Sequence, residues 1–194
     1  MINITLKDGS VKQYSEETSV ISIAKDISEG LARNVISANF NDKVVEVNSM
    51  INEDGKLEFY TWDNDEGKSA FWHSSSHVMA QSIQELFPGV KLTIGPAINS
   101  GFYYDVDLGS HKISESDFDK IESRMLEICR EKHDFNLRPV SKKEAIKFYK
   151  EEDNDYKLEL INDLKDGEIT FCDHSNFTDL CKGGHLSLIH ISEP

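Results

Sequence analysis

Two pairs of side chains in this sequence have the types and spacing of a metal-binding or hydrolytic site. His73 and His77 are four residues apart in a segment that is predicted to be helical, so both imidazoles project from one face. Cys181 and His185 are four residues apart in a glycine-rich loop that follows a predicted strand. Three imidazole nitrogens and one sulfur form a ligand set that suits tetrahedral Zn²⁺. We therefore predict that the two pairs converge around one small cavity.

Each pair alone is a weak signal, because a hydrogen-bonded histidine pair on a helix is commoner than a pair of metal ligands. The two pairs together are a stronger signal, since the second follows the end of a strand far downstream of the first. The remaining histidines lack such partners, and we expect them at the surface: His111, His133, His174 and His190. Cys129 lies on an apolar stripe and is predicted to be a core thiol.

Composition limits the classes of function. The chain has 194 residues and three cysteines with no CxxC pair, which favours free thiols or a metal ligand in a reducing cytoplasm. No apolar segment approaches the ~20 residues that span a bilayer, and no signal peptide is expected. The net charge of −14 argues against this chain binding RNA by itself, because RNA-binding surfaces are usually basic.

The first third of the chain reads as a small β-grasp unit. Residues 2–6 and 11–14 alternate as strands around a Lys7–Ser10 turn, and Thr18 can cap a helix that extends to Leu31. A second hairpin over residues 35–40 and 44–47 and a closing strand at 57–62 complete it.

The rest of the chain has the pattern of an α+β domain. After a polar boundary at residues 63–68, Ser69 can cap a long helix that ends at Leu86 or Phe87. Strands are predicted at 90–94, 102–106, 135–140 and 168–172, and helices at 115–132, from Ser141 to about Glu152, and at 156–164. Ser141 and Glu144 predict a capping box, and residues 173–185 are predicted to be a loop.

Four segments carry a family resemblance: HSSSHVMAQ at 73–81, IGPAINSGFYYDVD at 94–107, DYKLELI at 155–161 and FTDLCKGGH at 177–185. With the β-grasp unit in front, the chain resembles the N-terminal part of bacterial threonyl-tRNA synthetases. The resemblance implies a ubiquitin-like TGS domain at residues 1–61 and an α+β editing domain of the SAD type at residues 62–186. That editing domain is expected to be incomplete at its C-terminal end.

The resemblance also implies an editing reaction, the hydrolysis of tRNA(Thr) that carries serine. Serine lacks one methyl group of threonine, and a binding site rejects a missing group of that size by only about 1–3 kcal/mol, so a second site is needed. By resemblance the editing pocket contains six catalytic residues: His73, His77, Lys157, Asp179, Cys181 and His185. The resemblance makes Tyr104 a wall of the pocket that contacts substrate. By themselves, Lys157 would be a solvated helix lysine and Tyr104 a core aromatic residue.

Roles within the pocket follow as hypotheses. His73 or His185 takes the proton of water, Lys157 stabilises charge or positions the ribose, and Asp179 orients a partner or the ammonium group. A related alanyl-type domain holds zinc with a similar His, His, Cys, His set, whereas in the threonyl branch the same residues can act on water without metal. Zn²⁺ at His73, His77, Cys181 and His185 therefore stays an open alternative.

The sequence departs from the family pattern in two places. Gly184 replaces the usual proline before the final histidine, and residues 187–194 (SLIHISEP) have no counterpart and are expected to be a non-native tail. The ligation core with its ATP and Mg²⁺ sites is expected to be missing, together with the domains through which the parent enzyme forms a homodimer. Two other functions stay open: a free-standing deacylase that edits in trans, and a non-catalytic TGS and zinc-binding module.

Overall fold

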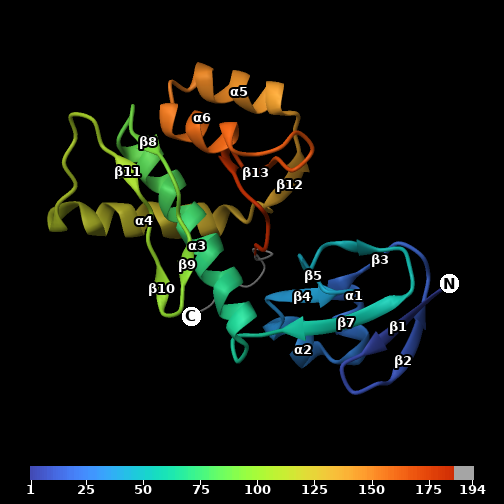
Figure 1. Cartoon of the computed structure of the whole chain (residues 1–194). Coiled ribbons are helices and arrows are strands. Elements are labelled where there is room, and N and C mark those ends of the chain that lie inside the picture. Colours follow the sequence, from blue (N-terminus) through green and yellow to red (C-terminus); the bar gives the residue numbers. More distant parts are fainter. Residues whose placement is uncertain (186–194) are drawn as a thin grey trace. The chain divides into compact units, whose positions relative to one another are not determined.

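The computed structural model describes residues 1–185 (Figure 1). The described chain divides into two compact units, His73–Gly183 and Met1–Trp72, with Gly184 and His185 assigned to the latter. The division falls inside helix α3 (Asp65–Leu86). The domain boundary predicted between residues 61 and 62 stays a prediction. The tail predicted at 187–194, with His190, lies outside the described residues.

The first unit is built on a five-stranded sheet of order β2-β1-β7-β4-β5. Its strands are β1 (Ile2–Leu6), β2 (Val11–Tyr14), β4 (Ser37–Phe40), β5 (Lys43–Val45) and β7 (Gly55–Tyr60). The central pair β1 and β7 is parallel, whereas the other pairs in the sheet are antiparallel. Two short strands, β3 (Thr18–Ser19) and β6 (Met50–Ile51), pair separately. This is the ubiquitin-like β-grasp arrangement that the order of elements and the family resemblance predicted.

The helix of the first unit differs from the prediction. Two helices form, α1 (Val20–Ile27) and α2 (Glu29–Asn34), and Ser19 rather than Thr18 caps the first. Ser28 separates them because its extended backbone donates to the Ala24 carbonyl while its side chain accepts from the Leu31 amide. One residue thus serves as C-cap and N-cap, which the apolar periodicity alone does not reveal.

Helix α3 begins at Asp65, four residues before the predicted cap at Ser69. Asn64 explains the difference, because its side chain accepts from the Thr61 amide at 2.8 Å and its carbonyl accepts from the Lys68 amide. The acidic residues Asp65 and Glu66 then occupy the first turn, where they complement the helix dipole.

The second unit combines this helix with short strands and three further helices. Strand β8 (Lys91–Leu92) pairs with β11 (Val106–Asp107), and β9 (Ala97–Ile98) pairs with β10 (Gly101–Phe102). Helix α4 (Glu115–Glu131) starts with a capping box between Ser114 and Asp117 and ends at Lys132, which has φ 56°. The predicted helix at 115–132 is therefore confirmed. The strands predicted at 90–94 and 102–106 are shorter than predicted and are interrupted.

A three-stranded antiparallel sheet carries the C-terminal half of the unit. Its strands β12 (Asn136–Pro139), β13 (Thr170–His174) and β14 (Phe177–Leu180) pair in that order. Helices α5 (Lys142–Glu151) and α6 (Asp155–Asn162) lie side by side above this sheet (Figure 1) and share a core with it that includes Ile161 and Phe171. The prediction of a loop over 173–185 is wrong for residues 173–174, which end β13, and for residues 177–180, which form β14.

Two smaller results complete the fold. Ser141 caps α5 through the Glu144 amide, but the Glu144 carboxylate accepts from Arg138 at 2.9 Å, so the reciprocal half of the predicted capping box is not made there. Among the described residues, no helix is long and apolar enough to cross a membrane.

The α+β fold class is confirmed by the fold of the two units.

Candidate functional site

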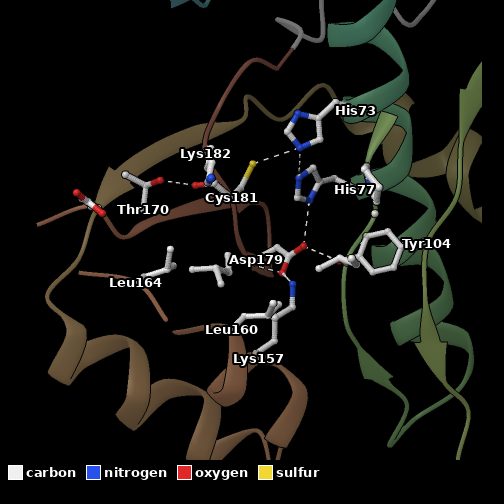
Figure 2. A pocket seen from close by; sticks show the side chains of 15 residues that line it. His73, His77, Tyr104, Lys157, Leu160, Leu164, Thr170, Asp179, Cys181 and Lys182 are labelled. Carbon is white, nitrogen blue, oxygen red and sulfur yellow. Dashed lines mark hydrogen bonds and ion pairs between the residues drawn. The ribbon is translucent and has the colours of Figure 1, made fainter. Parts of the chain in front are cut away.

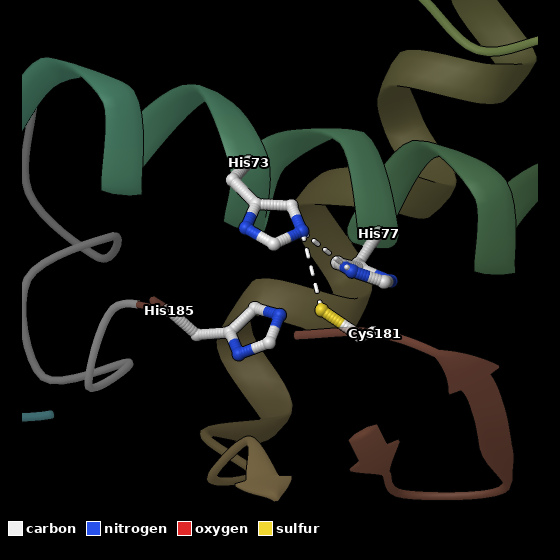
Figure 3. Close-up of side chains that lie close together, drawn as sticks. All are labelled: His73, His77, Cys181 and His185. Carbon is white, nitrogen blue, oxygen red and sulfur yellow. Dashed lines mark hydrogen bonds between the residues drawn. The ribbon is translucent and has the colours of Figure 1, made fainter. Parts of the chain in front are cut away.

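The candidate site forms where helix α3 faces the end of strand β14. His73 and His77 project from one face of α3, and their Nε2 atoms are 3.2 Å apart. The Sγ atom of Cys181 lies 3.3 Å from His73 Nε2, and the Gly183 amide donates to the same sulfur at 3.3 Å. Figure 3 shows both histidine rings turned toward the cysteine. The helical spacing of four residues thus brings two imidazoles to one thiol.

His185 completes a four-residue group that the sequence predicted. One ligand atom from each of His73, His77, Cys181 and His185 lies within 4.8 Å of the others (Figure 3). Three nitrogens and one sulfur in this proximity match the donor types and number of a tetrahedral Zn²⁺ site. The donors therefore fit a zinc ion, and their convergence is what the spacing of the two pairs predicted.

The glycines after the cysteine have the backbone conformation that this group needs. Gly183 and Gly184 have φ values of 91° and 88°, which glycine adopts at little cost. A Cβ atom on Gly183 would also come within 2.8 Å of Leu137. Proline cannot adopt a positive φ, so Gly184 gives the loop a path that the proline of the family pattern would exclude.

Asp179 lies at the centre of the polar contacts of the site (Figure 2). Its Oδ1 accepts from Lys157 Nζ at 2.5 Å, from the Leu180 amide at 2.8 Å and from the Tyr149 hydroxyl at 3.4 Å. Its Oδ2 accepts from the Tyr104 hydroxyl at 2.6 Å and lies 3.4 Å from His77 Nδ1. The carboxylate therefore has its lone pairs engaged by protein groups.

Burial and charge act against each other at this carboxylate. Burial by itself would raise the pKa of Asp179, but the charge of Lys157 and the hydrogen bonds from Lys157 and Tyr104 hold that pKa below its ordinary value. Burial, together with the Asp179 charge, raises the pKa of Tyr104 well above its ordinary value. Asp179 is therefore ionised, and Tyr104 is a neutral hydrogen-bond donor.

The carboxylate of Asp179 lies on the Nδ1 side of the His77 ring. A carboxylate 3.4 Å from Nδ1 favours the tautomer that is protonated there, which leaves a lone pair on Nε2. This lone pair points toward His73 and Cys181 (Figure 3), where either a proton or a metal ion can accept it. A carboxylate behind a metal-ligating histidine is a common support in zinc sites.

A cavity of about 500 Å³ opens beside this group. His73, His77, Tyr104, Lys157, Asp179 and Cys181 contribute to its lining. Apolar side chains such as Leu160 and Leu164 form another part of the wall (Figure 2). The Gly95 backbone packs so tightly against the Tyr104 ring that a Cβ atom there would clash with it. The cavity is large enough for a small organic group and is lined by both polar and apolar side chains.

Sequence reasoning about single residues missed part of this arrangement. Lys157, which would read as a solvated lysine, has only 2% of its surface exposed and lies in a fully buried ion pair. Only the resemblance had singled it out. Tyr149 was not singled out at all, although its hydroxyl reaches Asp179. Its position on the apolar stripe of α5 looks like that of any core aromatic residue, so no sequence signal indicated the contact.

The surface position predicted for His174 is wrong. Only 1% of its surface is exposed, its ring stacks on Phe135, and its Nδ1 lies 2.7 Å from Gln81 Oε1. The Gln81 amide nitrogen donates to Asn176 and Glu85, so its oxygen is the acceptor and His174 carries its proton on Nδ1. Burial and the neighbouring His133 lower the pKa of His174 to about 4.

This lowered pKa predicts a loss of stability in weak acid. The unfolded chain protonates His174 near pH 6.5 and the folded chain only near pH 4, so protons favour unfolding between these values. We expect the free energy of unfolding to fall by roughly 2–3 kcal/mol as the pH falls through this range, because His174 must be protonated. Urea denaturation at several pH values, compared with His174→Asn, isolates the effect. Parallel stability curves for the two proteins would contradict it.

Metal binding by the four-residue group gives a second prediction. Co²⁺ should bind the chain with the absorption of a tetrahedral ion with a thiolate ligand, because Cys181 provides sulfur beside imidazoles. Cys181→Ser should remove the thiolate-to-metal band, while Cys129→Ser, which changes a buried thiol outside the group, should retain it. Equal spectra for the two variants would show that the cobalt is bound elsewhere.

The chain is similar to known proteins along most of its length. The TGS domain family matches residues 2–61. The threonine–tRNA ligase of Flavobacterium psychrophilum is 61% identical over 186 residues, which is 96% of this chain and 28% of the relative. The corresponding ligase of Flavobacterium johnsoniae is 60% identical over the same shares. That of Caldanaerobacter subterraneus subsp. tengcongensis is 47% identical over 94% of this chain and 28% of the relative.

These matches extend over nearly the whole chain, which itself spans less than a third of the length of these relatives. The match at residues 2–61 agrees with the β-grasp sheet of the first unit. The predicted recognition is confirmed: the chain is a relative of the N-terminal region of threonine–tRNA ligases and contains a TGS domain at residues 2–61.

Proposed function

We propose that this chain hydrolyses the ester bond of tRNA(Thr) that carries serine, as the editing part of a threonine–tRNA ligase. The observation that supports this proposal most strongly is the buried Lys157–Asp179 pair at the wall of a cavity that also contains His73, His77 and Cys181. A charged pair of this kind is costly to bury, and such pairs gather at sites that perform chemistry. The names of the relatives supply the tRNA and the amino acid threonine.

Ester hydrolysis needs a water molecule, a proton acceptor and a group that stabilises the developing oxyanion. Asp179 is poorly suited as the acceptor, because its lone pairs are engaged and its pKa is lowered. His73 is the better base, since it is only partly buried and lines the cavity. It takes the proton of the attacking water and returns it to the ribose oxygen that leaves.

Lys157 supplies the positive charge for this reaction. Its ammonium donates one hydrogen bond to Asp179, which leaves two N–H groups that can reach the cavity it lines. These groups stabilise the negative charge that forms on the carbonyl oxygen when water attacks. Asp179 holds Lys157 and His77 in place, and Tyr104 fixes the carboxylate from the other side.

A zinc ion would be held by His73, His77, Cys181 and His185. When bound with an open position it would activate water or polarise the ester carbonyl, whereas four protein ligands would make it structural. In a metal-free site, the same His73 and His77 remain available to exchange protons with water. Hydrolysis measured with and without a chelator separates these two forms of the proposal.

The test of the proposal is a deacylation assay with the chain and two substrates, seryl-tRNA(Thr) and threonyl-tRNA(Thr). We expect seryl ester to be cleaved well above its spontaneous rate and threonyl ester to be spared, because the additional methyl group must be excluded. The assay needs a high protein concentration, since a net charge of −14 gives the chain little affinity for RNA. Seryl ester that decays no faster than without protein would refute the activity.

A further inference from the structure

The face of α3 that carries His73 and His77 also carries polar side chains further along the helix. His73, His77, Gln81 and Glu85 follow one another at intervals of four residues and therefore lie along one stripe of the helix. Gln81 is the last residue of the HSSSHVMAQ segment, and only 1% of its surface is exposed. It contacts neither the cavity nor the four-residue group, so the proposed reaction gives it no role.

The side chain of Gln81 connects three elements. Its Oε1 accepts from His174 Nδ1 at 2.7 Å, and its Nε2 donates to Asn176 Oδ1 at 3.1 Å. The same Nε2 donates to Glu85 Oε1 at 3.1 Å, and Glu85 in turn pairs with Arg124 of α4. The buried amide therefore has its acceptor and both donor directions satisfied, which fixes its orientation.

His174 and Asn176 flank the turn between β13 and β14. Strand β14 leads from that turn to Asp179 and then to Cys181, while α3 leads back from Gln81 to His77 and His73. The helix and the hairpin thus meet at three successive levels. Gln81 meets the turn, His77 lies against Asp179, and His73 lies against Cys181.

We propose that Gln81 is a positioning residue that sets the register of the β13–β14 hairpin against α3, so that Asp179 and Cys181 arrive opposite His77 and His73. Apolar contacts would hold the hairpin on the helix but would allow it to slide. Directed hydrogen bonds to both sides of the turn prevent such sliding. A shift by one residue would turn Asp179 and Cys181 to the other face of the strand. This inference rests on the proposed function only for its effect on hydrolysis.

The experiment compares the 194-residue chain with its Gln81→Met variant, which keeps the length of the side chain and removes its three hydrogen bonds. We expect kcat for seryl-tRNA hydrolysis to fall by about 10–100-fold with KM nearly unchanged, the range that is typical for residues supporting a site from behind. We also expect the alkylation rate of Cys181, located by peptide mass analysis, to rise by about tenfold or more. Both changes follow if the sulfur leaves the His73 side chain.

Two controls separate positioning from general loosening. Gln84→Met makes the same chemical change one turn away, at a residue for which the described part of the structure shows no hydrogen bond, and should leave both readouts unchanged. Ile128→Val weakens the core at a fully buried position of α4 and should lower stability alone. Wild-type values of kcat and Cys181 alkylation in Gln81→Met would overturn the inference, as would equal changes in Ile128→Val.

The two readouts distinguish failure of the proposed function from failure of this inference. If the wild-type chain does not hydrolyse seryl-tRNA, the proposed function fails, but the alkylation rate still reports whether Gln81 places Cys181. If hydrolysis occurs and Gln81→Met changes neither readout, the proposed function stands and Gln81 has no positioning role.

Discussion

Replacing Lys157 by methionine should lower the free energy of unfolding by about 3–5 kcal/mol, because it leaves a buried carboxylate without its cation. Lys157 and Asp179 have side-chain exposures of only 2% and 4%, so water cannot replace the lost charge. Chemical denaturation at neutral pH measures the change. The result would show that the pair is part of the folded core as well as of the site.

The control for this prediction lies on the surface of α5. Lys147→Met breaks an ion pair with Glu151 in which the lysine is 78% exposed, and should change stability by less than about 0.5 kcal/mol. The double variant Lys157→Met with Asp179→Asn should be more stable than Lys157→Met alone, because it removes the uncompensated charge. If the double variant is no more stable, the carboxylate is not buried in the folded protein as described.

Removing the imidazole of His73 should lower the rate of seryl-tRNA hydrolysis by about 10²–10⁴-fold, the usual contribution of a general acid or base. His73 is only partly buried, so His73→Ala should fold, and the loss should appear in kcat. Single-turnover deacylation with protein in excess measures this rate directly. It excludes the effect of slow product release.

His111→Ala is the matched control, because it removes an exposed imidazole whose Nε2 lies near the Pro88 carbonyl, away from the cavity. This variant should hydrolyse seryl-tRNA at the wild-type rate. A rate for His73→Ala equal to that of His111→Ala would assign the proton transfer to another group. Lys157→Met, examined at a temperature where it remains folded, would then test whether charge stabilisation alone accounts for the rate.

The sequence allowed prediction of those features that depend on local spacing. The alternation around Ile2 and Ile4 indicated a strand, and the interval between His73 and His77 placed both rings on one side of a helix. The convergence of this pair with Cys181 could also be proposed, since the donor types suit one metal ion. These inferences need only the repeat of a helix or a strand and the chemistry of the side chains.

Features that depend on tertiary burial could not be read in this way. The charge of Lys157 normally indicates solvent, and only the folded chain shows that Asp179 is its partner. His174 looks like a surface histidine until strand β14 turns back and encloses it. The same hairpin was hidden because residues 173–185 are rich in polar and glycine residues, which usually form loops.

The saturated carboxylate of Asp179 has a consequence for how this site could evolve. Its surroundings are arranged during folding, so the electric field that acts on an arriving ester is already present and needs no rearrangement. Folding bears the cost of desolvating both charges. Replacement of Lys157 and Asp179 by two apolar side chains of similar volume could therefore yield a sturdier protein that has lost its chemistry. At this position, selection for stability and selection for activity favour different residues.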